Sequence, residues 1–299
     1  PGVTRLNGLA PGETLPVYQV RARNLLRDHP NRIHDDLVAR RHGFAAGLVA
    51  GTTVYAYLTH PVVARLGPAW LEGGTAHVRF RRPVYEGDEV RVRARVVGRS
   101  GGEVAGEIGL EIVAATSGEE TAALMVAGLA WGAPPVTPDP ARYPEAPLPV
   151  SPPPATAAAL AALDPVGSPA LVLEAAVAAG YVADHDEVLD CYRGPGAVAH
   201  PGLLLQQANR ALSENVRLGP WAHVTSDVGY TGLARVGDRL STRGRVARVW
   251  ERDGRGYVEL DLLVLVDGVR PVMHVRHQAL YNFGLPVGAE SARPGRPHA

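Results

Sequence analysis

The sequence contains no lysine, so all 30 of its basic residues are arginine. Enzymes that form a Schiff base on lysine, anchor pyridoxal phosphate through it or hold phosphates with a P-loop lysine are therefore excluded. Thirty acidic residues balance the arginines and give a formal net charge of zero. This balance argues against nucleic acid or an anionic membrane as the main partner.

Cysteine is almost as scarce, since Cys191 is the single one. One thiol can form neither an intramolecular disulfide nor a cysteine-rich metal site, which favours a reducing compartment. No apolar run reaches the ~18 residues of a membrane span, and residues 1–16 lack the apolar core of a secretory signal. We therefore expect a soluble, cytoplasmic protein with no metal and no other cofactor.

The chain is long enough for about two domains, since it has 299 residues, of which 46% are hydrophobic. Between Pro134 and Pro154, ten of 21 residues are proline, a density that excludes helix and favours a stiff connector. We predict an N-terminal unit over 1–133, a linker over 134–154 and a C-terminal unit over 155–299.

The two predicted units repeat one another. Four ordered matches lie at offsets of 150 to 152 residues: Arg65–Pro68 with Arg217–Pro220, Gly87-Asp88 with Gly237-Asp238, His34–Asp36 with His185–Glu187, and Gly51 with Gly202. Several matches at one offset indicate an internal repeat rather than chance. We therefore expect both halves to share one fold.

Each half shows one apolar helical run followed by alternating strands. The helices are expected at Gly47–Leu58 and His200–Leu212. The strands are expected at Thr75–Phe80, Asp88–Gly98, Glu103–Thr116, Glu120–Trp131, His223–Gly232, Asp238–Trp250, Gly256–Asp267 and Arg270–Phe283. This order predicts an α+β fold in which each half packs a central helix on an antiparallel sheet. The alternating Arg91, Arg93 and Arg95 fit a solvated strand face.

The most informative stretch runs from Asp28 to Gly51. Asn31–His34 (NRIH), followed by Gly43–Gly51 (GFAAGLVAG), resembles the hydratase motif of MaoC-like enzymes. The resemblance implies the hot-dog fold, in which a sheet wraps one long helix. Together with the repeat, it implies a double hot-dog, with two units in one chain.

The resemblance also implies a reaction, the reversible addition of water to a 2-enoyl thioester of coenzyme A or acyl carrier protein, as in fatty acid metabolism. His34 would hold and activate the water, and Asn31 would orient the loop or the substrate. Backbone N–H groups from Gly47 to Gly51, where the helix begins, would polarise the thioester carbonyl. As alternatives, His34 could cap the adjacent helix and Asn31 could be a turn former.

The stretch departs from the family pattern at the catalytic aspartate. That residue lies five positions before the histidine, where this chain has His29, and Asp28 stands one position further away. Either a bulge in the loop returns Asp28 to the site, or the carboxylate has been lost. Ala50 also stands where the family usually has a histidine. Asp28 therefore enters the predicted catalytic set, beside His34 and Asn31, with these two alternatives open.

In the second half, His185 and Asp186 match the repeat but the Asn-x-Ile-His context is gone. We expect this half to be non-catalytic and to shape the acyl tunnel, with His200 as a substrate-pocket candidate beside the helix start. Two other functions stay open. A thioesterase would use Asp28, Asp35 or Asp36 as base or nucleophile, and a non-catalytic subunit would only bind the thioester. A homodimer is also possible, because exposed sheet edges pair readily.

Overall fold

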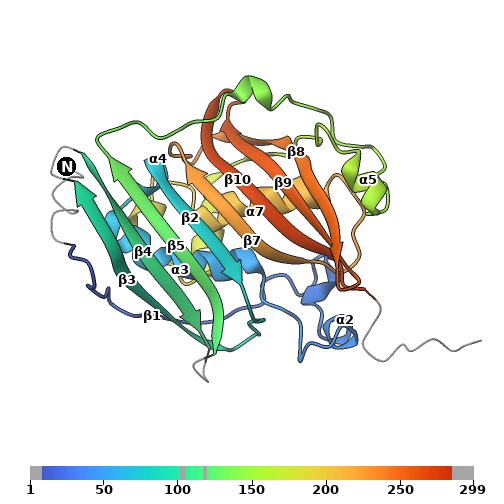
Figure 1. Cartoon of the computed structure of the whole chain (residues 1–299), viewed down its shortest axis with the longest axis horizontal. Helices are drawn as coiled ribbons and strands as arrows, with labels where there is room; N and C mark the ends of the chain where they lie inside the picture. The colour runs from blue at the N-terminus through green and yellow to red at the C-terminus, as the bar shows by residue number, and fades with distance from the viewer. Residues whose placement is uncertain (1–8, 102–104, 117–119, 285–299) are drawn as a thin grey trace, which may run out of the picture.

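The structure is a computed structural model that describes residues 9–101, 105–116 and 120–284. Its ten strands form a single antiparallel sheet in the order β1-β3-β4-β5-β2-β7-β10-β9-β8-β6 (Figure 1). The first unit contributes β1 (Tyr18–Arg21), β2 (Gly74–Phe80), β3 (Glu89–Gly101), β4 (Gly106–Ala115) and β5 (Thr121–Trp131). The second contributes β6 (Ala170–Val172), β7 (Ala222–Tyr230), β8 (Arg239–Arg252), β9 (Arg255–Val266) and β10 (Arg270–Asn282).

Two helices lie against one face of this sheet, α3 (Gly51–Leu66) and α7 (Pro201–Ser213), and they pack on each other (Figure 1). The shorter helices are α2 (Asp36–Arg41), α4 (Trp70–Gly73), α5 (Ala157–Ala161) and α6 (Ala175–Asp184), with single 3-10 turns at Arg32–His34, Pro140–Arg142 and Asp190–Tyr192. A helix on an antiparallel sheet, repeated once, is the predicted α+β layout, which the structure confirms.

The two halves of the sheet join where β2 pairs with β7, from Thr75 opposite Gly229 to Arg79 opposite Thr225. The hydrogen-bonded ladder therefore runs unbroken from one unit into the other. One apolar cluster spans both halves, because the inward faces of all the long strands pack on the same helix pair. The units therefore share one core, and residues from both can meet at the join.

The long strands lie close to their predicted positions, because their alternation of apolar and polar residues matches a sheet with one buried face. Val90, Val92, Ala94 and Val96 are buried as expected, and the arginine row between them lies on the opposite face. The predicted start of β4 at Glu103 lies outside the described residues. The edge strands β1 and β6 were not predicted, since three or four residues carry too little periodicity.

Helix α3 begins and ends later than predicted. Gly47–Ala50 is extended instead of helical, because Leu48 bridges Tyr85 and the Val49 N–H bonds to Val84 O at 2.8 Å. The helix continues through Pro61 to Leu66, since apolar residues after position 58 are buried in the core. This shift places Gly51, and not Gly47, at the first helical position.

The proline-rich segment runs from the end of β5 past the ends of strands β10 and β9 to the second unit (Figure 1). Its one short helical element is the turn at Pro140–Arg142, as expected for such a composition. Tyr143 anchors it, since the ring is buried with Leu263 and Leu265 and the hydroxyl lies 3.1 Å from Asp261 Oδ1. The domain boundaries at 133 and 154 stay a prediction. Within the described part of the chain, no helix is long and apolar enough to span a membrane.

Candidate functional site

A cavity of about 970 Å³ opens at the N-terminus of α3, between the two units. The first unit lines it with the loop around Asn31 and His34, the start of α3 and the end of β2. The second unit lines it with one face of α7, with Trp221 just before β7, and with His223 at the start of that strand. Concave cavities lined by apolar residues and a few converging polar groups are the usual places where small molecules bind.

His34 presents a basic nitrogen to this cavity. Its Nδ1 lies 2.7 Å from the carbonyl oxygen of Leu48, which can only accept, so Nδ1 carries the proton. Nε2 is then left with its lone pair. Burial lowers the pKa of His34 below its usual value, although the bond to Leu48 opposes this shift. The imidazole is therefore neutral at pH 7 and can act as a base.

Asn31 ties the His34 loop to the second unit. Its amide nitrogen donates to Trp221 O at 3.0 Å, and its oxygen accepts from Trp221 N at 3.2 Å and from Ile33 N at 3.3 Å. The same amide nitrogen lies 3.4 Å from His34 Nε2, at the long end for a hydrogen bond. Asn31 thus holds the loop across the join and orients the His34 ring.

His29 occupies the position of the family's aspartate and lines the cavity with His34. Its Nδ1 accepts from Asn31 N at 3.0 Å, so Nε2 carries the proton and can donate. The two rings stand edge to face with centroids 6.3 Å apart, and burial lowers the pKa of His29 as well. The site therefore pairs one imidazole acceptor, on His34, with one imidazole donor, on His29.

The N-terminus of α3 faces the cavity without a side-chain cap. Ala50 is the N-cap residue and makes no capping hydrogen bond. The first N–H groups of a helix have no intrahelical acceptor and carry a partial positive charge. Both Gly51 and Thr52 line the cavity. With alanine as its N-cap residue, this helix end is available to an anion or a polarised carbonyl.

Gly47 does not line the cavity, but it supports the loop that does. A Cβ here would lie 2.0 Å from the carbonyl oxygen of His34, so only glycine fits. That carbonyl accepts from Asn24 Nδ2 at 2.8 Å, and Gly47 N donates to Asp36 Oδ1 at the same distance. The structure thus places Gly47 behind His34, and its predicted role in binding substrate stays a prediction.

We expect Gly47→Ala to lower the free energy of unfolding by about 1–3 kcal/mol, because the methyl group must displace the His34 backbone. Urea unfolding followed by circular dichroism measures the change. Gly180→Ala in α6 is the matched control, since no atom lies within 4 Å of its added Cβ, and we expect it to be neutral or slightly stabilising. Equal stability of the two variants would contradict the close packing of Gly47 against His34.

The aspartates nearest the motif lie away from the cavity. Asp28 is exposed and lines a neighbouring hollow with Asn24 and Glu86, which shares Leu26 and His29 with the cavity but does not bring Asp28 into its lining. Asp35 caps α2 through Val38 N and pairs with Arg32 at 2.7 Å. Among the described residues that line the cavity, Asp253 is the one acid, and it is exposed. Asp28 is therefore absent from the cavity lining, and its predicted catalytic role stays a prediction.

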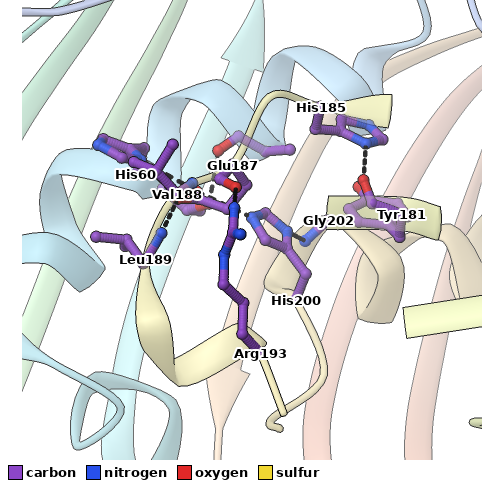
Figure 2. Close-up of polar contacts among 11 residues, drawn as sticks. His60, Tyr181, His185, Glu187, Val188, Leu189, Arg193, His200 and Gly202 are labelled. Carbon is purple, nitrogen blue, oxygen red and sulfur yellow. Dashed lines mark hydrogen bonds and ion pairs between the residues drawn. The ribbon is translucent and has the colours of Figure 1, made fainter. Parts of the chain in front are cut away.

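His200 lies in a different cluster, at the N-terminus of α7 (Figure 2). Its Nδ1 accepts from Gly202 N at 3.1 Å, and its Nε2 lies 3.6 Å from Glu187 Oε2. Glu187 also contacts His60 Nδ1 at 3.0 Å and accepts from the N–H groups of the two residues that follow it. The structure therefore places His200 outside the cavity, and its predicted substrate contact stays a prediction.

Burial opposes the ionisation of Glu187, but hydrogen bonds from His200 and His60 outweigh it and hold the pKa of this carboxyl well below its usual range. Burial also lowers the pKa of His200 despite the neighbouring Glu187. We therefore assign an ionised carboxylate held by a neutral His200 ring. This arrangement is a closed structural network, since Glu187 is 3% exposed and His200 is also 3% exposed.

The two helix N-termini are therefore unequal. The one on α7 is capped by His200, and a Cβ on Gly202 would lie 2.2 Å from the Tyr181 hydroxyl, which covers this end. The one on α3 has no such cap and faces the cavity. This asymmetry supports the expectation that the first unit carries the chemistry.

His223, at the start of β7, is a cavity residue that sequence reasoning missed. Its Nε2 lies 2.8 Å from Ser226 Oγ, which lies 3.0 Å from His277 Nδ1. Its Nδ1 is buried and has no hydrogen-bond partner among the described residues, and it packs on Gly51 at the start of α3. Glycine suits position 51 because the His223 ring occupies the space that a larger side chain would need. No motif marks His223, since it reaches the site only through the strand pairing between units.

Neither the family models nor the curated proteins include a match to this chain. Solved structures do resemble it. A protein assigned as a MaoC domain dehydratase from Chloroflexus aurantiacus has a TM-score of 0.65 at 14% identity, over 92% of this chain and 96% of that one. A conserved hypothetical protein from Mycobacterium tuberculosis with a double hotdog fold has a TM-score of 0.65 at 19% identity, over 94% and 98%.

A protein assigned as an oleoyl thioesterase from Lactobacillus plantarum also resembles the chain, with a TM-score of 0.51 at 12% identity over 91% of this chain and 98% of that one. Likeness at such low identity concerns the fold, and it extends across both units. The chain therefore has a double hot-dog fold of the kind seen in MaoC-like dehydratases.

Proposed function

We propose that this protein is a hydro-lyase that adds water to, or removes it from, a 2-enoyl or 3-hydroxyacyl thioester carried by coenzyme A or acyl carrier protein. The observation that carries the proposal is the unprotonated Nε2 of His34 in a cavity that also exposes the uncapped N-terminus of α3. The hot-dog neighbours assigned as dehydratases support the same reaction class.

In the hydration direction, the thioester carbonyl lies at the start of α3, where N–H groups and the helix dipole stabilise negative charge on its oxygen. His34 Nε2 takes a proton from water as the water oxygen bonds to C3. The electron pair of the double bond moves to C2 and the carbonyl, giving an enolate. The imidazolium then returns the proton to C2, so water is added and His34 is regenerated.

His29 contributes by holding the water. Its Nε2–H can donate to the water oxygen and leave one water hydrogen directed at His34. The contact of Asn31 with His34 Nε2 is long at 3.4 Å, so a water molecule can replace it at small cost. One histidine can serve as both base and acid in sequence, which makes the mechanism independent of a carboxylate.

A second candidate function is non-catalytic thioester binding, which the position of Asp28 outside the cavity favours. The thioesterase alternative is less well supported, because Asp28, Asp35 and Asp36 all lie away from the cavity or are occupied in the loop. Among the described lining residues the one carboxylate is the exposed Asp253, so no buried carboxylate lies beside the bound thioester to act as nucleophile or base for hydrolysis.

The test is mass spectrometry of the protein incubated with trans-2-butenoyl-CoA. We expect a product heavier by one water without release of free CoA. Release of CoA would establish a thioesterase and contradict the proposal. Unchanged substrate, together with saturable binding of the thioester, would establish the non-catalytic subunit.

A further inference from the structure

The cavity at the start of α3 has two unlike walls. The first unit contributes buried apolar residues to it, namely Ile33, Val49, Val54 and Val84. Helix α7 of the second unit contributes only polar residues, namely Gln206, Asn209, Arg210 and Ser213. Burial against the apolar wall stabilises a hydrocarbon group, whereas the α7 wall suits a ligand segment that has hydrogen-bonding groups of its own. The acyl group therefore fits the first unit and leaves α7 to another part of the substrate.

Two side chains on the α7 wall are open to such a segment. Gln206 and Ser213 are half-buried, and neither has a side-chain hydrogen-bond partner in the described part of the chain. Arg210 differs from them, since Glu214 already holds it at 2.6 Å. Asn209 differs too, because its Oδ1 atom is inaccessible to solvent. The amide of Gln206 and the hydroxyl of Ser213 are thus the groups that α7 offers to a ligand.

Both carriers of the proposed substrate contain a segment of matching chemistry. Coenzyme A and acyl carrier protein each hold the acyl group on a 4′-phosphopantetheine arm, which has two amides and a hydroxyl between the sulfur and the phosphate. These three groups extend over ~8 Å of the arm. Gln206 and Ser213 are two helical turns apart, ~10 Å along the axis of α7. One arm can therefore reach both side chains.

The direction of the arm follows from the place where α7 meets α3. A Cβ on Gly202 would lie 3.1 Å from Thr52 O, so the first turn of α7 packs beside the start of α3. Gln206 is one turn further along α7, and Ser213 lies two turns beyond it. With the thioester carbonyl at the start of α3, the amide next to the sulfur lies nearer Gln206, and the distal amide and hydroxyl lie nearer Ser213.

An arginine of the second unit is available for the phosphate. Arg255, at the start of β9, is exposed, lines the same cavity and has no ion pair within the described ranges. Asp253 also lines the cavity, but its carboxylate lies 3.5 Å from Arg252. A guanidinium group binds phosphate oxygens through paired, charge-assisted hydrogen bonds.

We propose that the second unit binds the carrier, with the pantetheine arm along α7, its polar groups at Gln206 and Ser213, and its phosphate at Arg255. This inference rests on the proposed function and assigns a part of the substrate to each unit. It differs from the predicted acyl tunnel in the second unit, because the wall that α7 gives to the cavity is polar.

The experiment uses inert thioethers in which the arm is lengthened stepwise. S-butyl-N-acetylcysteamine keeps the amide next to the sulfur, and S-butyl-pantetheine adds the second amide and the hydroxyl. S-butyl-4′-phosphopantetheine adds the phosphate, and S-butyl-CoA completes the series. Isothermal titration calorimetry gives the affinities without turnover.

Each variant should affect only the probes that reach its side chain. Gln206→Leu should weaken all four by about fivefold, the usual loss for one hydrogen bond. Ser213→Ala should weaken the three longer probes similarly and leave the shortest within about twofold. Arg255→Gln should weaken the two phosphorylated probes by about tenfold or more and leave the other two within about twofold.

Gln19→Leu and Arg252→Gln are the matched controls, because both residues are exposed and neither lines the cavity. All four affinities should stay within about twofold in these variants. A higher affinity for S-butyl-CoA than for S-butyl-4′-phosphopantetheine would support the inference with coenzyme A as the carrier. Equal affinities would support it with acyl carrier protein as the carrier.

Unchanged affinities in Gln206→Leu, Ser213→Ala and Arg255→Gln would overturn the inference but leave thioester binding intact. Equal weakening of all four probes by Ser213→Ala or by Arg255→Gln would overturn it too, since the loss would not depend on the arm. Failure of every probe to bind the unchanged chain would refute the proposed function as well.

Discussion

His34→Ala is expected to lower kcat for hydration of trans-2-butenoyl-CoA by about 10²–10⁴-fold, the usual contribution of a positioned acid–base group. The variant removes the lone pair on His34 Nε2, the ring nitrogen that is left unprotonated because Nδ1 donates to the Leu48 carbonyl. KM should change little, because the carbonyl contacts at the start of α3 remain. Steady-state kinetics, followed by loss of enoyl-thioester absorbance, measures both constants.

Asp28→Asn is the matched control, since this exposed carboxylate lies in the neighbouring hollow. We expect its kcat to stay within about twofold of the unchanged chain. The kcat of His29→Ala should lie between those of His34→Ala and Asp28→Asn, because His29 holds the water but does not receive its proton. Full activity of His34→Ala, or a loss in Asp28→Asn as large as that expected for His34→Ala, would contradict the assigned roles.

The free energy of unfolding is expected to fall steeply as the pH drops below about 6.5, because five buried or half-buried histidines have lowered pKa values in the folded state. They are His34, His185, His200, His223 and His277. Burial is the main cause in each case. The unfolded chain binds protons there that the folded chain does not, so stability rises with pH and is lost as the pH falls.

The pKa of His185 is lowered to about 4 and that of His277 to about 3. Each therefore lowers the free energy of unfolding by up to about 1.4 kcal/mol for each pH unit between pH 6.5 and its pKa in the folded state. Glu187, whose pKa is also lowered, adds a further loss below pH 4.5. Urea midpoints from pH 8 to pH 4.5 measure the slope.

His277→Asn should make this slope shallower, whereas His77→Asn should not, because the His77 side chain is 55% exposed in its pair with Asp227. Stability that is flat from pH 8 to pH 5 would show that these imidazoles are not held neutral.

Much of the fold could be predicted from the sequence because its signals are local. The alternation along β3 and the turn pairs Gly87-Asp88 and Gly237-Asp238 each depend on neighbouring residues. The nearly constant offset of the repeat predicted that the two units share one fold. The start of α3 was predicted four residues early. Leu48 pairs with Tyr85 and this keeps the segment extended, but the two residues are too far apart in the sequence for a local pattern to show it.

The site was predictable only in part, for the same reason. His34 reaches the cavity as expected, because the motif carries it. Asn31 bonds to Trp221, and His223 packs on Gly51, through a join that no local pattern encodes. His200 sits beside a helix start as predicted, yet it caps α7 and contacts Glu187, because the second unit fills the equivalent space with Tyr181.

The central claim is that the thioester binds at the uncapped start of α3 and not at the start of α7. The most direct measurement is a titration of the ¹⁵N-histidine-labelled protein with S-butyl-CoA, followed by imidazole nitrogen shifts. The account predicts shifts at His29, His34 and His223, with His60, His185 and His200 unchanged. Shifts confined to His60, His185 and His200 would place the site at the start of α7 and contradict it.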